Sequence, residues 1–240
     1  MKIAIMQPTF NPWIGYFELI DYVDKFIFLD TVQLSKRSWQ TRNKLKIGAK
    51  EKLFSIPILK TDSRDLLTIT KAKISYEQYD FRDKLYALIK QNYKQAKYFQ
   101  EVDPFIKDIL YFKTDSLSLY NINLITNISK KIGIKTEIST LSKISYSSDK
   151  TKGELILDIC DFLKCDTYVS ALGSKNYLED LRAKFSEKSI KLLYQNYSHP
   201  SYEQLGETFL AYIGVVDLLY NNGFKNALSI IKSGRCYEDR

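Results

Sequence analysis

The chain has 240 residues, of which 45% are hydrophobic and 27% charged, a mixture typical of a globular protein and not of a disordered one. It contains no apolar run of about 18 residues, which argues against a transmembrane helix, and the apolar start before Gln7 is too short for a secretion signal. Lys and Arg number 36 against 28 Asp and Glu, and the net charge of +8 favours anionic partners. We therefore expect a cytoplasmic protein.

The first 30 residues predict a βαβ unit. The apolar run 2–6 is followed by a loop that Pro8 and Pro12 make stiff. Residues 13–23 have helical apolar spacing, and a second apolar run covers 25–29. Strand, helix and strand in this order form a parallel pair with a right-handed crossover.

The rest of the chain continues the alternation of strands and helices. Further strands are predicted at 53–59, 71–74, 136–138, 167–170 and 191–197. Helices are predicted at 81–91, 98–112, 117–132, 153–163, 176–188, 209–220 and 225–232, and a Ser- and Lys-rich loop at 142–152. This pattern indicates an α/β fold, Rossmann-like and doubly wound, with a mainly parallel sheet and a helical insertion or cap. We expect one domain over 1–240, with the insertion around 77–132.

The cysteines predict neither disulfides nor structural zinc. Cys160 and Cys165 are spaced too widely for a zinc knuckle, the third cysteine is Cys236, and the chain has one histidine. We expect reduced thiols and no metal site.

Ligands of open parallel sheets bind beyond the carboxyl ends of the strands. Three predicted loops fall there: 7–15, 30–33 with the basic and aromatic stretch behind it, and 170–174. The first loop, Thr9-Phe10-Asn11-Pro12 followed by Gly15, resembles the start of the nucleotidyltransferase and class I synthetase superfamily. In that superfamily, a His-x-Gly-His signature holds ATP phosphates at a helix N-terminus.

The matching stretch here is Trp13-Ile14-Gly15-Tyr16, which keeps the glycine and lacks both histidines. The backbone of a helix start can bind phosphate without side chains, so the resemblance favours a nucleotide-binding fold and puts nucleotidyl transfer in doubt. The alternative is a plain βα turn in which Gly15 serves close packing.

A longer set of residues resembles the WbqC-like protein family. At the N-terminal end it comprises Gln7-Pro8, Pro12-Trp13, Gly15-Tyr16-Phe17, Asp24, Phe26, Asp30, Val32-Gln33, Lys36-Arg37, Trp39 and Arg42-Asn43. At the C-terminal end it comprises Tyr168, Ser170, Gly173, Tyr177-Leu178, Tyr202, Gln204, Asp217-Leu218-Leu219, Asn221 and Gly223. The resemblance covers nearly the whole chain. It implies a bacterial, cytoplasmic protein connected with O-antigen or other lipopolysaccharide and surface-glycan biosynthesis.

The candidate side chains have both functional and structural interpretations. Asp30 follows an apolar strand and could bind Mg²⁺ or a hydroxyl, accept a proton, or form a turn. Lys36, Arg37, Arg42 and Lys44 could clamp a diphosphate or form a solvated loop. Trp39 could stack on a base or sugar, or anchor the loop in the core. The side-chain amides of Gln33 and Asn43 could form hydrogen bonds with a ligand or with backbone groups.

His199, in a Ser-His-Pro sequence after a strand, is a candidate general base because its pKa lies near neutral pH, although a lone histidine is more often structural. The sequence contains no Gly-x-Ser-x-Gly elbow, Walker loop or complete Gly-x-Gly-x-x-Gly. Serine hydrolases, P-loop NTPases and standard dinucleotide dehydrogenases are therefore disfavoured.

We predict a transferase of surface-polysaccharide synthesis that moves an acyl or aminoacyl group onto a nucleotide-linked amino sugar, with ATP and Mg²⁺ or an acyl-CoA as candidate donors. Asp30 and His199 are the predicted catalytic residues. The predicted substrate-binding residues are Gln7, Asn11, Trp13, Gly15, Tyr16, Gln33, Lys36, Arg37, Trp39, Arg42, Asn43, Ser170, Gly173, Tyr202 and Gln204. Alternatives are a non-catalytic nucleotide- or nucleic-acid-binding protein and a nucleotidyltransferase without the usual histidines. The sugar, the transferred group and the oligomeric state stay open.

Overall fold

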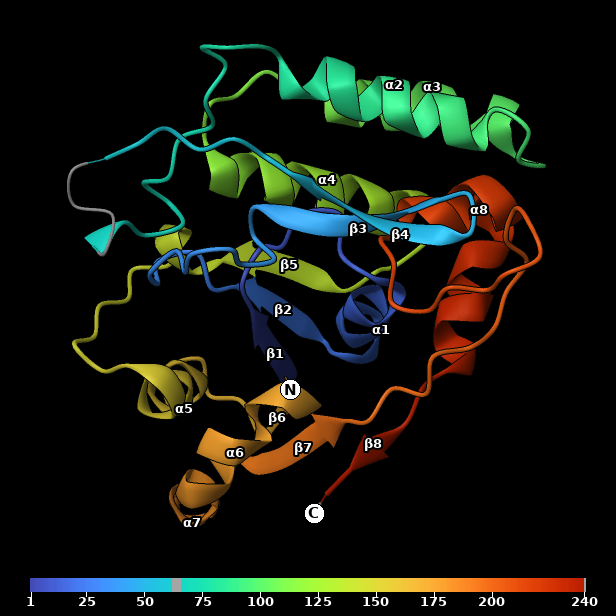
Figure 1. Ribbon diagram of the computed structural model, residues 1–240. Coiled ribbons are helices and arrows are strands. Elements are labelled where there is room, and N and C mark those ends of the chain that lie inside the picture. The colour runs from blue at the N-terminus through green and yellow to red at the C-terminus, as the bar shows by residue number, and fades with distance from the viewer. Residues whose placement is uncertain (62–65, 240) are drawn as a thin grey trace.

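A computed structural model describes residues 1–61 and 66–239, with a mostly parallel six-stranded sheet at its centre (Figure 1). The strands, in spatial order, are β5 (Glu137–Thr140), β2 (Lys25–Phe28), β1 (Lys2–Met6), β6 (Thr167–Ala171), β7 (Lys191–Gln195) and β8 (Tyr237–Glu238). The first five are parallel to their neighbours, and β8 pairs antiparallel with β7. This order confirms the predicted Rossmann-like α/β fold.

Helices cover both faces of the sheet because successive strand residues point to opposite sides. Ala4 and Phe26 belong to a core shared with α1 (Ile14–Tyr22), α4 (Leu117–Lys131) and α8 (Val216–Ser233). Ile3 and Ile27 belong to the other core, with α5 (Lys152–Phe162), α6 (Lys175–Leu178) and α7 (Arg182–Glu187). The stretch 77–132, predicted to be an insertion, contains α2 (Phe81–Tyr93), α3 (Phe99–Leu110) and α4; α2 and α3 lie outermost at the top of Figure 1, while α4 packs against the sheet.

The sequence prediction missed an antiparallel hairpin outside the main sheet. It consists of β3 (Arg42–Ile47) and β4 (Lys50–Ser55), paired in register from Arg42 with Ser55 to Ile47 with Lys50. The strand predicted at 53–59 was placed too late, since β4 ends before Pro57. The short strand predicted at 71–74 was wrong as a strand: isolated bridges join Ile74 to Ile58 and Lys73 to Ser116.

Two predicted helices, at 176–188 and 209–220, differ from the structure. The helix expected at 176–188 is divided into α6, η4 (Glu179–Leu181) and α7, preceded by η3 (Leu172–Ser174). The helices expected at 209–220 and 225–232 meet within α8 at a kink at Gly223, whose φ of 72° is left-handed, so the predicted break around Asn221–Gly223 is confirmed. The helix begins at Val216 and not at 209, because the Gly214 and Val215 N–H groups donate to Lys44 and Pro12 carbonyls instead. The predicted 142–152 loop begins with η2 (Leu141–Lys143).

Candidate ligand-binding site at the carboxyl ends of the strands

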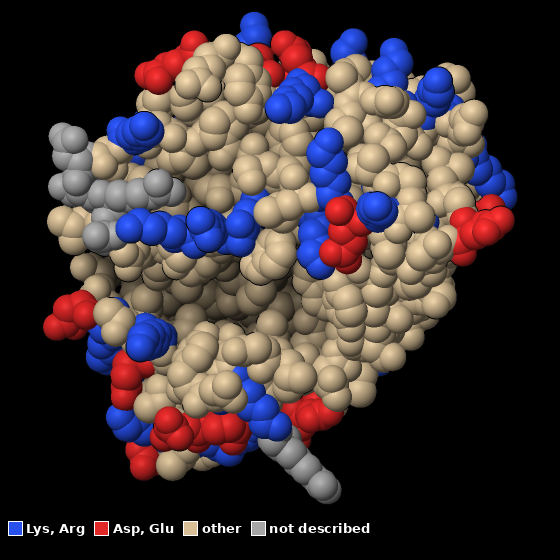
Figure 2. Space-filling view, in the orientation of Figure 1, with Lys and Arg blue, Asp and Glu red and all other residues tan. Residues whose placement is uncertain are grey.

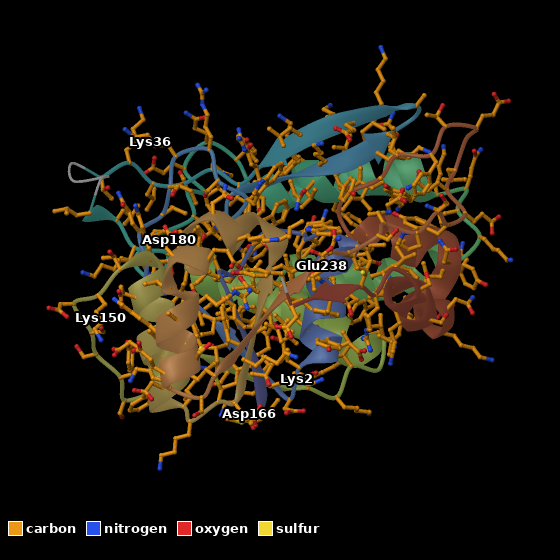
Figure 3. The ribbon with its side chains drawn as sticks, turned by 90° about the horizontal axis from the view of Figure 1, so that it is seen from below. Lys2, Lys36, Lys150, Asp166, Asp180 and Glu238 are labelled. Atoms are coloured by element: carbon orange, nitrogen blue, oxygen red, sulfur yellow. The ribbon has the colours of Figure 1, made fainter. Side chains whose placement is uncertain are left out.

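The topological switch point of the sheet lies at β1. From β1 the chain passes to β2 on one side, and it later returns to β6 on the other side. Figure 2 shows a hollow between the layer that contains the hairpin and the layer of α5 and α6, with Lys and Arg side chains along its upper rim. In Figure 3, Lys2 and Asp166 lie at the amino ends of β1 and β6, opposite to Lys36. The hollow therefore opens where ligands of such sheets bind.

A pocket of about 360 Å³ lies at the end of β1, whose last residue, Met6, lines it. Its lining residues are Met6, Thr9, Pro12, Trp13, Tyr16, Trp39, Asn43, Lys44 and Tyr212. We call it the Trp13–Trp39 pocket. Its volume is in the range of small-molecule sites. It brings together four of the predicted binding residues, Trp13, Tyr16, Trp39 and Asn43.

Four aromatic side chains that differ in exposure line this pocket: Trp13, Tyr16, Trp39 and Tyr212. Trp39 is 49% exposed and Tyr212 is 53% exposed, so two large aromatic side chains lie at its mouth. The ring centroids of Trp13 and Tyr212 are 5.2 Å apart. Gly15 makes room for the Trp13 indole, since a Cβ at that position would lie 2.1 Å from the ring. Gly15 thus has the close-packing role that was the alternative interpretation. Aromatic walls of this kind suit a planar or pyranose ring.

Side-chain amides build the loop after β1. Asn43 Nδ2 donates to the carbonyls of Phe10 at 2.9 Å and Asn11 at 2.8 Å. Asn11 has a left-handed φ of 42° and packs against Gly214, where a Cβ would lie 1.9 Å from its Nδ2. These contacts give Asn11 and Asn43 a structural role in shaping the pocket.

Two further amides support the start of the same loop. Asn121 Nδ2 donates to the carbonyls of Pro8 at 3.0 Å and Gln40 at 2.8 Å. Gln40 Nε2 donates to Gln7 Oε1 at 2.5 Å, and Tyr16 Oη donates to the Gln7 carbonyl at 2.9 Å. Gln7 and Tyr16 therefore hold the loop, and Tyr16 in addition lines the pocket.

The basic residues lie beside the pocket on the stretch that leads into β3. The Arg42 guanidinium is 5.9 Å from the Trp39 ring centroid, and its buried Nε has no hydrogen-bond partner within residues 1–61 and 66–239. Lys44 forms an ion pair of 2.7 Å with Glu51. Lys36 and Arg37 are exposed on the loop before Trp39. Of the predicted phosphate ligands, Lys44 lines the pocket itself, and Arg42 lies against its Trp39 wall.

Asp30 is buried at the end of β2. Its carboxylate accepts from the Ser142 N–H at 3.0 Å and the Ser142 Oγ at 2.6 Å, and Ser118 Oγ is 3.4 Å away. These bonds join the end of β2 to the segment after β5 and to α4. The carboxylate does not line the Trp13–Trp39 pocket, and its catalytic role stays a prediction.

His199 lies behind the pocket wall. Its ring is 6.1 Å from Trp13 and 4.9 Å from Tyr212, centroid to centroid, and Tyr197, Tyr202 and Phe209 complete an aromatic cluster around it. Nδ1 contacts the Pro200 carbonyl at 2.9 Å, while Nε2 is buried without a partner among the described residues. Burial lowers the pKa of His199, so the imidazole is neutral near pH 7. Its predicted proton-transfer role is untested.

A buried polar cluster that sequence analysis missed lies beneath the same segment. Lys46 is 4% exposed and Asp217 is 1% exposed. Lys46 Nζ donates to Gln204 Oε1 at 3.1 Å and to the Thr208 carbonyl, while Tyr93 Oη donates to Asp217 Oδ1 at 2.9 Å. Burial raises the pKa of Asp217 to about 6 and lowers that of Lys46. The predicted residue Gln204 therefore anchors the 199–215 segment.

Four other predicted residues lie apart from the Trp13–Trp39 pocket. Tyr202 belongs to the aromatic cluster around His199. Ser170 is buried at the end of β6, with its Oγ 3.5 Å from Tyr168 Oη, and Gly173 is exposed in η3. Gln33 lines a second cavity at the ends of β2 and β5.

The start of α1 is covered. The backbone of Trp13 bridges to Gly214, and Ile14, Gly15 and Tyr16 are buried beneath this contact. A phosphate held by the first-turn N–H groups, as the nucleotidyltransferase resemblance suggested, would have to displace this packing.

The described residues contain no cluster of three or more His, Cys, Asp or Glu side chains that could hold a metal ion. In the same part of the chain, no helix is both long and apolar enough to cross a membrane. Cys160, Cys165 and Cys236 are free thiols, and burial raises the pKa of Cys160.

The sheet order and the switch-point pocket define a Rossmann-like α/β protein with a pocket at the carboxyl edge of its sheet. The model of the WbqC-like protein family matches residues 7–228, and the chain belongs to this family. It is 30% identical over 224 residues to the uncharacterized protein Rv1507c of Mycobacterium tuberculosis (strain ATCC 25618 / H37Rv), covering 92% of this chain and 94% of the relative. No solved structure matches the chain.

Proposed function

We propose that the protein is a transferase of surface-polysaccharide biosynthesis that acts on a nucleotide-linked amino sugar bound in the Trp13–Trp39 pocket. The observation that carries this proposal is the pocket itself: aromatic rings converge at the end of β1 beside an arginine. Rings bind the flat face of a base or the apolar face of a sugar, and each base–aromatic stack is worth about 1–3 kcal/mol.

The diphosphate of such a ligand would lie toward Arg42. A guanidinium forms two parallel hydrogen bonds with phosphate oxygens, and the half-buried Arg42 side chain lies 5.9 Å from the Trp39 ring centroid. Exposed Lys36 and Arg37 add positive charge to the same rim. Thr9 Oγ1, buried without a partner among the described residues, is the donor or acceptor available deeper in the pocket.

The transfer step would form an amide bond between the sugar amine and an activated acyl carbon. The bond from that carbon to its leaving group breaks, and the amine loses a proton. A proton-transfer role for His199 requires the pocket wall to rearrange, because the imidazole packs against the Trp13 and Tyr212 rings that line the pocket and does not line it itself. We expect His199 rather than Asp30 to serve, since the Asp30 oxygens already accept bonds from Ser142.

Isothermal titration calorimetry with UDP- and dTDP-linked amino sugars tests the proposal. We expect binding by the wild-type protein and at least a tenfold loss of affinity in Trp39→Ala. The matched control is Phe162→Ala, since Phe162 is likewise 49% exposed but lies at the end of α5. Absence of binding, or an equal loss in both variants, would overturn the assignment of this pocket.

A non-catalytic nucleotide-binding protein is the second candidate. It is favoured by one observation: the described residues that line the Trp13–Trp39 pocket include no carboxylate and no imidazole. Mass spectrometry of the sugar after incubation with acyl-CoA, or with an amino acid and ATP–Mg²⁺, distinguishes the two. Tight binding without any gain in mass of the sugar supports the binding protein.

A further inference from the structure

A second cavity, of about 710 Å³, opens at the ends of β2 and β5. Its lining residues are Thr31, Val32, Gln33, Leu141, Tyr146, Ser147, Ser148, Asp149, Lys150, Thr151, Lys152 and Leu155. We call it the Lys152 cavity. None of these residues lines the Trp13–Trp39 pocket, so the two spaces can be occupied independently.

The outer wall of the Lys152 cavity is fixed to α5. Tyr146 Oη and Lys150 Nζ each donate to the Asp158 carboxylate at 2.7 Å. The inner wall is fixed by Asp30, whose carboxylate holds Ser142 directly after β5. The space between the walls is therefore preformed, which lowers the entropy cost of binding a ligand there.

The chemistry of the lining suits an anionic group on an apolar base. Val32, Leu141 and Leu155 supply apolar surface, while the other side chains are mainly hydroxyls and lysines. The charge of Lys150 is paired with Asp158, and Asp149 is the one carboxylate of the lining. Lys152 is exposed and forms no ion pair in the described part of the chain, so its charge is available to a ligand.

The two sites are neighbours in the sheet. Met6 of β1 pairs in register with Phe28 of β2, and paired strands lie about 4.8 Å apart. The ends of β1 and β2 therefore open into the same face, where Figure 2 shows one continuous hollow. Lys36 and Lys150 lie on the same side of the molecule in Figure 3.

We propose that the Lys152 cavity binds the phosphate-bearing part of a second substrate, the donor of the transferred group. Its role as donor site rests on the proposed function, whereas phosphate binding itself does not. The sugar amine in the first pocket would attack the acyl carbon of the donor. The carbon–nitrogen bond forms, and the bond from carbon to the donor's oxygen or sulfur breaks with its electron pair leaving on that atom. The ammonium proton passes to a base or to water.

Calorimetric titration with inorganic pyrophosphate at low salt tests the phosphate site. Lys152→Ala should weaken binding about tenfold, since a hydrogen bond to a charged group is lost. Lys164→Ala is the matched control: both lysines are exposed, both have left-handed φ angles of 51° and 54°, and Lys164 follows the far end of the same helix. Absence of pyrophosphate binding, or equal losses in the two variants, would overturn the proposal.

The same titrations separate this proposal from the proposed function. Trp39→Ala should lose nucleotide-sugar binding and keep pyrophosphate binding. Lys152→Ala should lose pyrophosphate binding and keep nucleotide-sugar binding. Repeating the titration with ATP and with acetyl-coenzyme A identifies which of these two phosphate-bearing compounds the Lys152 cavity binds. If nucleotide sugars fail to bind while Lys152-dependent pyrophosphate binding persists, the proposed function is lost and the phosphate site stands.

Discussion

The Trp13 indole occupies the space that a side chain at Gly15 would need, because a Cβ there would lie only 2.1 Å from the ring. The start of α1 and the Trp13 side of the Trp13–Trp39 pocket therefore pack directly against each other. Gly15→Ala should destabilise the protein by about 1–3 kcal/mol through overpacking, and should move the indole. Urea unfolding measures the first effect and Trp fluorescence the second.

Gly173→Ala is the control for that experiment. A Cβ at Gly173 would meet nothing within 4 Å, so we expect little change in either measurement. Equal effects of the two substitutions would contradict the packing role of Gly15.

Glu18 is fully buried in α1 and accepts from Arg235 Nε at 2.6 Å. Removing the arginine leaves a buried carboxylate without its cation, which costs about 3 kcal/mol. Arg235→Ala should therefore lower the free energy of unfolding far more than Lys232→Ala. Lys232 is 46% exposed and pairs with Asp21 at 3.3 Å, a surface ion pair worth about 0–1 kcal/mol. Similar losses in the two variants would contradict this ranking.

Asp217 makes stability depend on pH. Its folded pKa is raised from 3.8 to about 6, so the folded state binds the proton more tightly than the unfolded state. The stabilisation is fully present below pH 4 and is lost as the pH rises through 6, by about 3 kcal/mol for two pKa units. In Asp217→Asn this loss is absent. The free energy of unfolding of the wild-type protein, relative to that variant, should fall between pH 4 and pH 7; a constant difference would show that the charge is not desolvated.

Tyr212 combines high exposure with a left-handed φ of 58°. Tyr212→Ala and Tyr212→Gly should both weaken nucleotide-sugar binding, because each removes one wall of the Trp13–Trp39 pocket. The glycine variant should be the more stable of the two by about 1 kcal/mol, since glycine adopts this conformation without strain. Differential scanning calorimetry and titration give the two readouts. Unchanged affinity in both variants would remove Tyr212 from the site.

Arg42→Ala should weaken nucleotide affinity at least tenfold and leave the melting temperature nearly unchanged. Lys52→Ala, an exposed cation on the neighbouring strand β4, is the comparison. Loss of affinity in both variants alike would indicate a general charge effect and not a phosphate contact at Arg42.

The central sheet could be predicted because its strands are compact apolar runs. Segments such as Lys2–Met6 and Lys191–Gln195 pair in parallel between helices, where both faces are buried. The β3–β4 hairpin could not be predicted, since its sequence is rich in lysine. Lys46 in it is buried through contacts with Gln204 and Thr208, more than 150 positions away.

The candidate site was predicted in part, because some of its residues are close in sequence and others come from a distant segment. Trp13, Trp39 and Asn43 lie in one stretch of sequence and share one pocket. Tyr212 completes that pocket from a segment that has helical apolar spacing but is not helical, since the Gly214 and Val215 N–H groups donate to carbonyls far away in the sequence. His199 and Gln204 do lie close to the pocket, but their side chains pack behind the residues that line it. No local sequence pattern distinguishes a residue that lines a pocket from one that packs behind the lining.

Strand β4 is an edge strand of the two-stranded β3–β4 sheet. Within the described residues, β4 pairs with β3 alone, so the N–H and C=O groups of its other edge have no strand partner. Such an edge can template the addition of a strand from another molecule. Lys50, Glu51 and Lys52 follow one another there and are all exposed. This run of charges protects the hairpin against aggregation while its partner strand β3 supplies the polar side of the pocket.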